Sequence, residues 1–121
     1  MSYTIQDKNL IASLAYLKEI GKFPKNKAKP NFESVREAEE AAKEDVVSVI
    51  NEGLHGLQQD ISDIQKKGVD LRLEGIRLLQ VPLKTKVWLA TVSREDLEKI
   101  FEILSEVEKK IIPLKERILK E

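Results

Sequence analysis

The chain has no cysteine among its 121 residues and only one histidine, His55. Without thiols it cannot form disulfides, thiolate metal sites or a cysteine nucleophile. A Ser-His-Asp triad would have to use His55, and none of the serines lies in a nucleophile-elbow sequence. The five glycines are scattered and form no phosphate-binding loop. These absences exclude most enzyme classes that a sequence motif would reveal.

Long apolar runs and an excess of one charge are missing as well. No stretch approaches the ~18 consecutive apolar residues of a membrane span, and the first residues do not follow a signal-peptide pattern. We therefore expect a cytoplasmic protein without a membrane segment. Basic and acidic residues number 21 each, so the net charge is zero and general binding to polyanions is disfavoured. Dense charge of both signs is also typical of thermophile surfaces.

The clearest pattern in the sequence is a heptad repeat over residues 94–120. Apolar side chains occupy its a and d positions at Leu97, Ile100, Leu104, Val107, Ile111, Leu114 and Ile118. Phe101 and Ile103 widen this apolar face on both sides, which favours a bundle over a two-stranded rod. Ser93 precedes the repeat and is a favourable N-cap residue. The pattern predicts a long helix that contacts at least two neighbours.

A second heptad repeat predicts a long helix over residues 34–66. Its apolar positions are Val47, Ile50, Leu54, Leu57, Ile61 and Ile64. Gly53 and Gly56 lie inside it and cost roughly 1 kcal/mol each relative to alanine, so they mark either a break or a close backbone contact. A shorter helix is predicted over residues 5–20. Residues 21–31 hold two prolines and four lysines and are predicted to link the two helices.

Residues 69–92 fit two patterns. Apolar and charged residues alternate over positions 69–74 as in a strand, whereas the abundance of Leu, Arg, Glu and Gln up to position 80 favours a helix. Helix is the preferred interpretation. We expect it to stop before Pro82, because a residue that precedes proline is pushed toward extended geometry.

Together these patterns predict an all-α fold in one helical domain that spans residues 1–121. The expected architecture is a small bundle of about four helices. In it, residues 34–66 and 94–120 form a long antiparallel, coiled-coil-like pair, and the first helix packs across them. The alternative is a helix–β-hairpin–helix layout with residues 69–92 as strands.

Glu52 and His55 form the one pattern typical of a metal site. The Glu-x-x-His spacing places a carboxylate and an imidazole on one face of a helix, as in di-iron bundles. Such sites need the motif twice, and this chain has one histidine. A solvent-facing His55 is the simpler interpretation. We therefore expect no metal site, no cofactor and no enzymatic activity.

The long apolar faces exceed what one short chain can cover, which predicts assembly. We expect a homo-oligomer, or a small subunit that docks on a larger complex. The expected interface comprises Leu97, Ile100, Phe101, Ile103, Leu104 and Trp88. The less favoured alternative is a nucleic-acid-binding accessory subunit that uses the lysine-rich linker, where flexible cations accompany one aromatic ring. Its expected contact residues are Lys22, Phe23, Lys25, Lys27 and Lys29.

Overall fold

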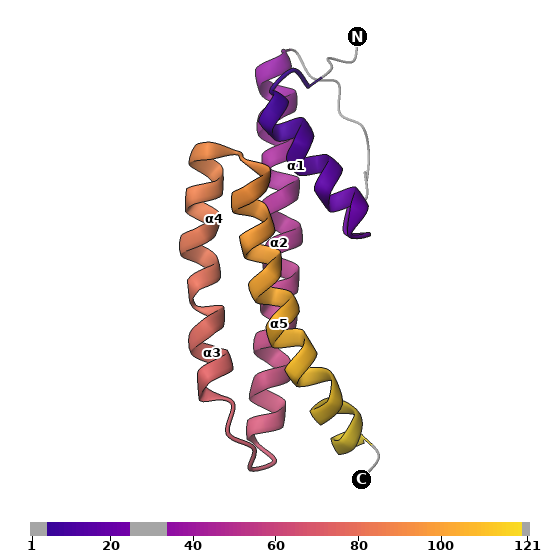
Figure 1. Ribbon diagram of the computed structural model, residues 1–121, viewed down its shortest axis with the longest axis vertical. Coiled ribbons are helices and arrows are strands. Elements are labelled where there is room, and N and C mark those ends of the chain that lie inside the picture. The colour runs from indigo at the N-terminus through magenta and orange to yellow at the C-terminus, as the bar shows by residue number, and fades with distance from the viewer. Residues whose placement is uncertain (1–4, 25–33, 120–121) are drawn as a thin grey trace.

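The computed structural model describes residues 5–24 and 34–119, which form five helices (Figure 1). They are α1 (Lys8–Glu19), α2 (Val35–Gln65), α3 (Arg72–Leu78), α4 (Gln80–Thr91) and α5 (Arg94–Leu119). No strand occurs in these two ranges, so the all-α prediction is confirmed and the β-hairpin alternative for residues 69–92 is wrong. None of these helices is long and apolar enough to cross a membrane.

The helices begin at capping residues that the sequence provides. The Asp7 carboxylate accepts hydrogen bonds from the amides of Asn9 and Leu10 at the start of α1. Ser34 Oγ accepts from the amide of Glu37 at 3.1 Å and so caps the start of α2. Ser93 Oγ accepts from the amide of Asp96 at 3.2 Å in the first turn of α5. Each side chain therefore satisfies amides that have no acceptor within the helix.

The two glycines in α2 do not break it, because the helix is continuous from Val35 to Gln65. A Cβ added at Gly53 would lie 3.5 Å from Leu104 Cδ1 of α5, an ordinary packing distance. A Cβ at Gly56 would have no atom within 4 Å. Of the two alternatives for these glycines, the break is therefore absent, and Gly53 lies where Leu104 of α5 packs against α2.

Residues 72–91 form two helices that meet at Leu79. Leu79 itself has αR geometry, at φ −65° and ψ −18°. Pro82 lies in the first turn of α4. The expectation that the helix ends before Pro82 is wrong, since Val81 lies within α4. A proline in a first turn is tolerated because the amide it lacks has no acceptor there.

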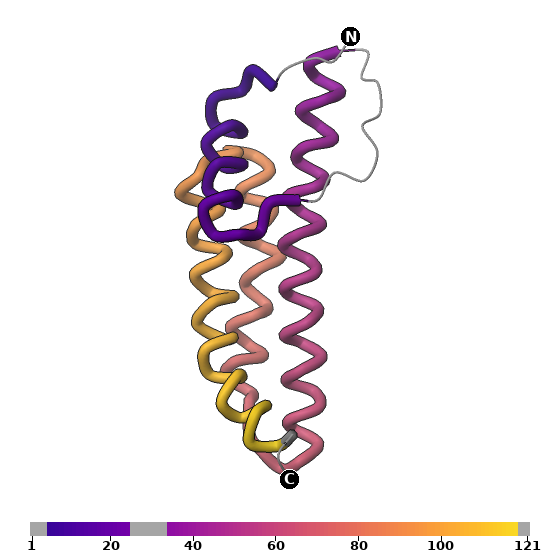
Figure 2. The backbone as a smooth tube through the Cα atoms, turned by 90° about the vertical axis from the view of Figure 1, so that its right-hand side faces the viewer, coloured from indigo at the N-terminus to yellow at the C-terminus, as the bar shows by residue number. Residues whose placement is uncertain are grey.

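The chain runs down α2, up α3 and α4, and down α5 (Figures 1 and 2). Later residues of α5 therefore meet later residues of α2: Gly53 faces Leu104, and Asp60 pairs with Lys115 at 3.3 Å. The expected antiparallel pairing of residues 34–66 with 94–120 is wrong, because these helices are parallel. The reason is that residues 72–91 form a full returning helix, which takes the place of the antiparallel partner.

The core of the described chain lies between α2, α3–α4 and α5. The apolar a and d side chains from Leu97 to Ile111 and from Ile50 to Ile64 are buried there. Trp88 enters the same core from α4 and is completely buried. The two heptad repeats thus predict the buried faces of α2 and α5.

α1 packs across α2 and α5 near the turn between α4 and α5 (Figure 2). Buried Ser13 donates to the carbonyl oxygen of Val92 at 3.0 Å and accepts from Trp88 Nε1 at 3.1 Å. Arg94 pairs with Glu19 at 2.5 Å and lies 5.3 Å from the centre of the Tyr16 ring. Burial, with added repulsion from the Glu98 charge, raises the pKa of Tyr16. These contacts hold α1 to the end of the bundle where α5 begins.

Candidate docking surface

The outer side of α3 and α4 carries an apolar stripe that no described helix covers. We call it the outer stripe. Its members, with their exposed fractions, are Leu73 (76%), Ile76 (59%), Leu79 (63%), Leu83 (65%) and Val87 (50%). Single exposed apolar residues are ordinary on protein surfaces, but a contiguous row of them marks an interaction site.

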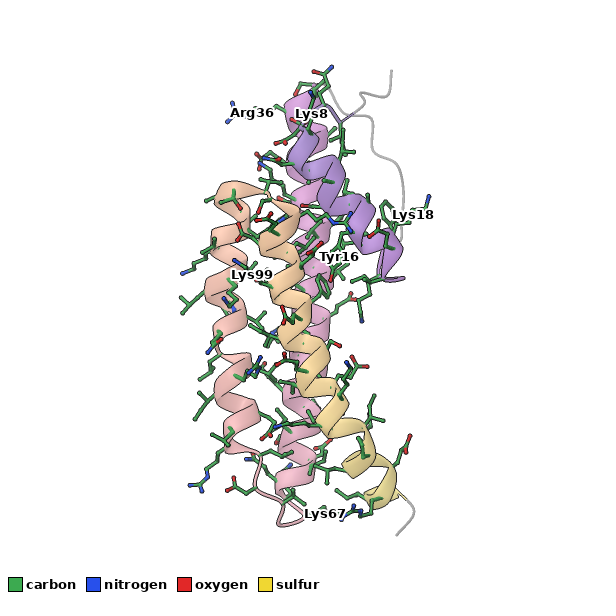
Figure 3. The ribbon with its side chains drawn as sticks, viewed as in Figure 1. Lys8, Tyr16, Lys18, Arg36, Lys67 and Lys99 are labelled. Atoms are coloured by element: carbon green, nitrogen blue, oxygen red, sulfur yellow. The ribbon has the colours of Figure 1, made fainter. Side chains whose placement is uncertain are left out.

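The spacing of these five residues places them on one side of the helices. Successive members are three or four residues apart, so at 100° per residue they fall within about 120° of arc. The row from Leu73 to Val87 is about 20 Å long at the helical rise per residue. Arg72 and Gln80 are the polar residues in the same arc. In Figure 3, side chains that end in carbon project from the outer side of α3 and α4, away from α2 and α5.

The opposite side of the same helices is already used by the core. Leu78, Val81, Thr85 and Trp88 are buried at spacings of three and four residues. Thr85 satisfies its hydroxyl by donating to the carbonyl oxygen of Val81 at 2.8 Å. α4 is therefore apolar on two opposite sides, of which only one is packed in the core. The outer stripe is the side that the described chain leaves open.

Basic residues border the outer stripe. Lys84 and Lys86 lie just beyond its two edges, and α4 contains no acidic residue. In α3, Arg77 pairs with Glu106, while Glu74 pairs with Lys110 at 3.5 Å. Arg72, at the start of α3, pairs with Asp70 at 3.0 Å. The charges of α3 are thus paired with α5 or with Asp70, whereas the α4 lysines form no salt bridge to any described carboxylate.

A shallow pocket of about 180 Å³ adjoins the outer stripe between α4 and α5. Lys84, Val87, Asp96 and Lys99 line it, and Figure 3 shows Lys99 beside α4. Asp96 accepts hydrogen bonds from Thr91 Oγ1 at 2.5 Å and Ser93 Oγ at 2.8 Å. The hydrogen bond from Thr91 lowers the pKa of Asp96 most, and the hydrogen bond from Ser93 lowers it further. The positive charges of Lys99 and Lys84 act in the same direction. The Asp96 carboxylate is thus held by the α5 cap, and the two lysines give the pocket a net positive charge.

The residues predicted to form an interface lie in the core instead. Trp88, Leu97, Ile100, Phe101, Ile103 and Leu104 are all buried within one chain. The face of α5 that the sequence marks as wide is covered on its two flanks by α1, α2 and α3–α4. A partner of the folded chain therefore has no access to these six side chains.

The lysine-rich linker lies partly outside the described residues. Lys22 is exposed and Phe23 is about half exposed, at 47%. Lys25, Lys27 and Lys29 fall in the range that the structure does not describe. The nucleic-acid contact of this segment stays a prediction.

His55 and Glu52 are both exposed on α2. Over residues 5–24 and 34–119, no group of three or more His, Asp or Glu side chains is placed to hold a metal ion. The described part of the chain therefore gives the Glu-x-x-His pattern no further ligands.

Sequence reasoning did not find the outer stripe. Leu73 also fits the strand-like alternation over positions 69–74, and the predicted end of the helix before Pro82 separates Ile76 from Leu83 and Val87. The signal that would have found it is a second apolar row, offset from the buried row of Leu78, Val81 and Trp88. That row becomes visible only once residues 72–91 are treated as one helical run.

Comparisons with protein-family models, with curated proteins and with solved structures found no match to this chain.

Proposed function

We propose that the protein is a non-catalytic helical adaptor that docks on a protein partner through the outer stripe. The observation that supports this proposal is the row of five exposed apolar side chains along α3 and α4, whose opposite side packs in the core. Covering this row with a partner helix would convert the three-sided bundle of α2, α3–α4 and α5 into a four-sided one. The lack of cysteine supports a cytoplasmic location as part of the same proposal.

The proposal revises where the interface lies, and it keeps the expectation of assembly. The apolar excess that suggested assembly is found on α3–α4, whereas α5 uses its apolar face for the core. A hydrophobic interface of this kind should weaken little with added salt, unlike phosphate binding.

A tagged chain and a double variant test this proposal in the source cells. Ile76→Gln/Leu83→Gln removes two central members of the outer stripe and leaves the core untouched. Ile11→Gln/Ile112→Gln is the matched control, because both of these isoleucines are about half exposed on other helices. We expect the wild type and the control to elute with a stoichiometric protein component, and the stripe variant to elute alone.

The measurement is the molar mass of each purified complex by light scattering, together with its protein composition. The free chain has a mass of 13.8 kDa. If the stripe variant and the wild type retain the same components at the same mass, the outer stripe is not the docking surface. Circular dichroism melts of the variants show whether each one is folded.

A further inference from the structure

We infer that the partner of the outer stripe is an acidic amphipathic helix of another protein. This inference rests on the proposed function and adds the chemistry of the partner. It follows from the charges that border the stripe, from the shape of the stripe and from the mismatch that a second copy would create.

Around the α4 half of the outer stripe lie three lysines and one carboxylate, so positive charge is in excess there. Lys84 and Lys86 border the two edges, and Lys99 joins Lys84 in the adjoining pocket. Asp96 in that pocket is hydrogen-bonded to Thr91 and Ser93 of its own helix cap. The Asp96 carboxylate offsets one of these three lysine charges, so a glutamate or aspartate of the partner would still meet an excess of positive charge, which is the arrangement that charge complementarity favours.

The shape of the stripe indicates a helix as the docking element. Its members repeat at three- and four-residue intervals over about four turns, as in the seam between two packed helices. An acidic helix with its own apolar row would place that row on the stripe and its carboxylates beside the lysines. This is the helix-in-groove mode of recognition.

A second copy of the chain fits this surface poorly. Two stripes related by a two-fold axis would bring two copies of Lys84 and Lys86 into one interface. The only acid in α3 or α4 is Glu74, and it already pairs with Lys110. Lysines of the two copies would therefore face one another without compensating acids, and this repulsion weakens the affinity of one copy for the other.

An anionic membrane surface also fits less well than a helix. Helices that lie in a membrane interface commonly use Trp or Phe at the apolar face. The outer stripe contains only Leu, Ile and Val, and the single tryptophan, Trp88, is buried. The zero net charge of the chain provides no long-range attraction to a negative surface.

Two synthetic peptides test the charge of the partner directly. Both are amphipathic helices with Leu and Ile on one face, and they differ only in whether Glu or Lys flanks that face. Each is fluorescently labelled and kept at nanomolar concentration, so that it remains monomeric while the full chain is titrated and anisotropy is recorded. We expect the Glu peptide to bind at least about tenfold more tightly than the Lys peptide, and this ratio to shrink at high salt.

Charge-reversal variants test whether the α4 lysines cause the preference for the Glu peptide. Lys84→Glu/Lys86→Glu should reverse the order of the two peptides. Lys66→Glu/Lys67→Glu makes the same change of charge at the turn after α2, where Lys67 lies at the far end of the bundle (Figure 3). This control should leave the order unchanged. Ile76→Gln/Leu83→Gln should abolish binding of the Glu peptide.

The outcomes separate this inference from the proposed function. If both peptides bind equally to the wild type and neither binds to the stripe variant, the inference of an acidic partner is wrong, and the outer stripe remains the docking surface. If neither peptide binds but the tagged chain still retains its partner through the outer stripe, the inference of an acidic helix is wrong and the proposed function stands. A dimer by light scattering that the stripe variant loses would assign the surface to a second copy. Stripe-dependent binding to phosphatidylserine vesicles would assign it to a membrane, and either result overturns the inference.

Discussion

Ser13 provides the only polar link that is buried between α1 and the turn from α4 to α5 among the described residues. Its hydroxyl joins Trp88 Nε1 to the carbonyl oxygen of Val92. Val92 has φ +54°, a left-handed geometry that is unfavourable for a β-branched residue. Three features together hold that geometry: the buried Val92 side chain, the hydrogen bond that the Val92 N–H donates to the Trp88 carbonyl oxygen, and the hydrogen bond from the Ser13 hydroxyl.

Replacing Ser13 with alanine should destabilise the protein by about 1 to 3 kcal/mol. The variant leaves a buried indole N–H and the Val92 carbonyl without this partner. Urea unfolding followed by the fluorescence of Trp88, the single tryptophan, measures the change. Ser105→Ala, on the exposed side of α5, should stay within about 0.5 kcal/mol of the wild type. Equal effects of the two variants would show that the buried link contributes nothing.

Asp96 should make the stability depend on acid pH. The hydrogen bonds from Thr91 and Ser93 lower its pKa below the ordinary value of 3.8. A carboxyl group with a lowered pKa in the folded state contributes stability above its unfolded pKa, and that contribution is lost as the pH falls through the folded pKa. The difference in the free energy of unfolding between wild type and Asp96→Asn should therefore be largest near neutral pH and should shrink below about pH 4. Urea titrations at several pH values measure it, and a difference that does not vary with pH would contradict the assignment.

At the scale of the elements, α2 keeps a glycine that its structure does not need. Gly56 is exposed, lies in a continuous helix, and has no atom within 4 Å of an added Cβ. Gly56→Ala should therefore stabilise the protein by about 0.5 to 1 kcal/mol in thermal or urea unfolding. Gly68→Ala should have the opposite sign, because Gly68 has φ +93° in the turn after α2. A loss of stability in Gly56→Ala would mean that another group approaches this position.

The register of α5 predicts a large contrast between two neighbouring positions. Leu104 is buried at 5% exposure against Gly53, whereas Glu102 is exposed. Leu104→Ala should cost about 2 to 5 kcal/mol, since it removes buried methyl groups and leaves a cavity. Glu102→Ala should change the free energy of unfolding by no more than about 0.5 kcal/mol. Similar melting temperatures for the two variants would contradict the register.

Local signals in the sequence were sufficient for α1, α2 and α5. Ser34 and Ser93 cap the starts of α2 and α5, and the heptad positions from Ile50 to Ile64 and from Leu97 to Ile111 are buried. The same signals were insufficient for residues 72–91, because that segment is apolar on two sides and so has no single period. Its helical state is decided by packing of Leu78, Val81 and Trp88 against α2 and α5.

At the scale of the whole molecule, the direction of α5 follows from what lies between the long helices. A short connection would have made α2 and α5 antiparallel neighbours, as the heptads alone suggested. The returning run of α3 and α4 makes them parallel and also creates the outer stripe. The expected interface was misplaced for the same reason, since α5 is enclosed by α1, α2 and α3–α4.

Cross-linking should confirm the parallel arrangement of α2 and α5. The chain has no cysteine, so only engineered thiols react with a short bismaleimide. Asp60→Cys/Lys115→Cys places thiols where two side chains pair at 3.3 Å, and it should form an intramolecular cross-link at low protein concentration. In an antiparallel pair, Asp60 would instead lie near Lys99, which is about 24 Å from position 115 along the helix. Asp60→Cys/Lys99→Cys should therefore remain unlinked, as read from the peptide masses after proteolysis. A cross-link in this second pair, and none in the first, would mean that α5 runs the other way.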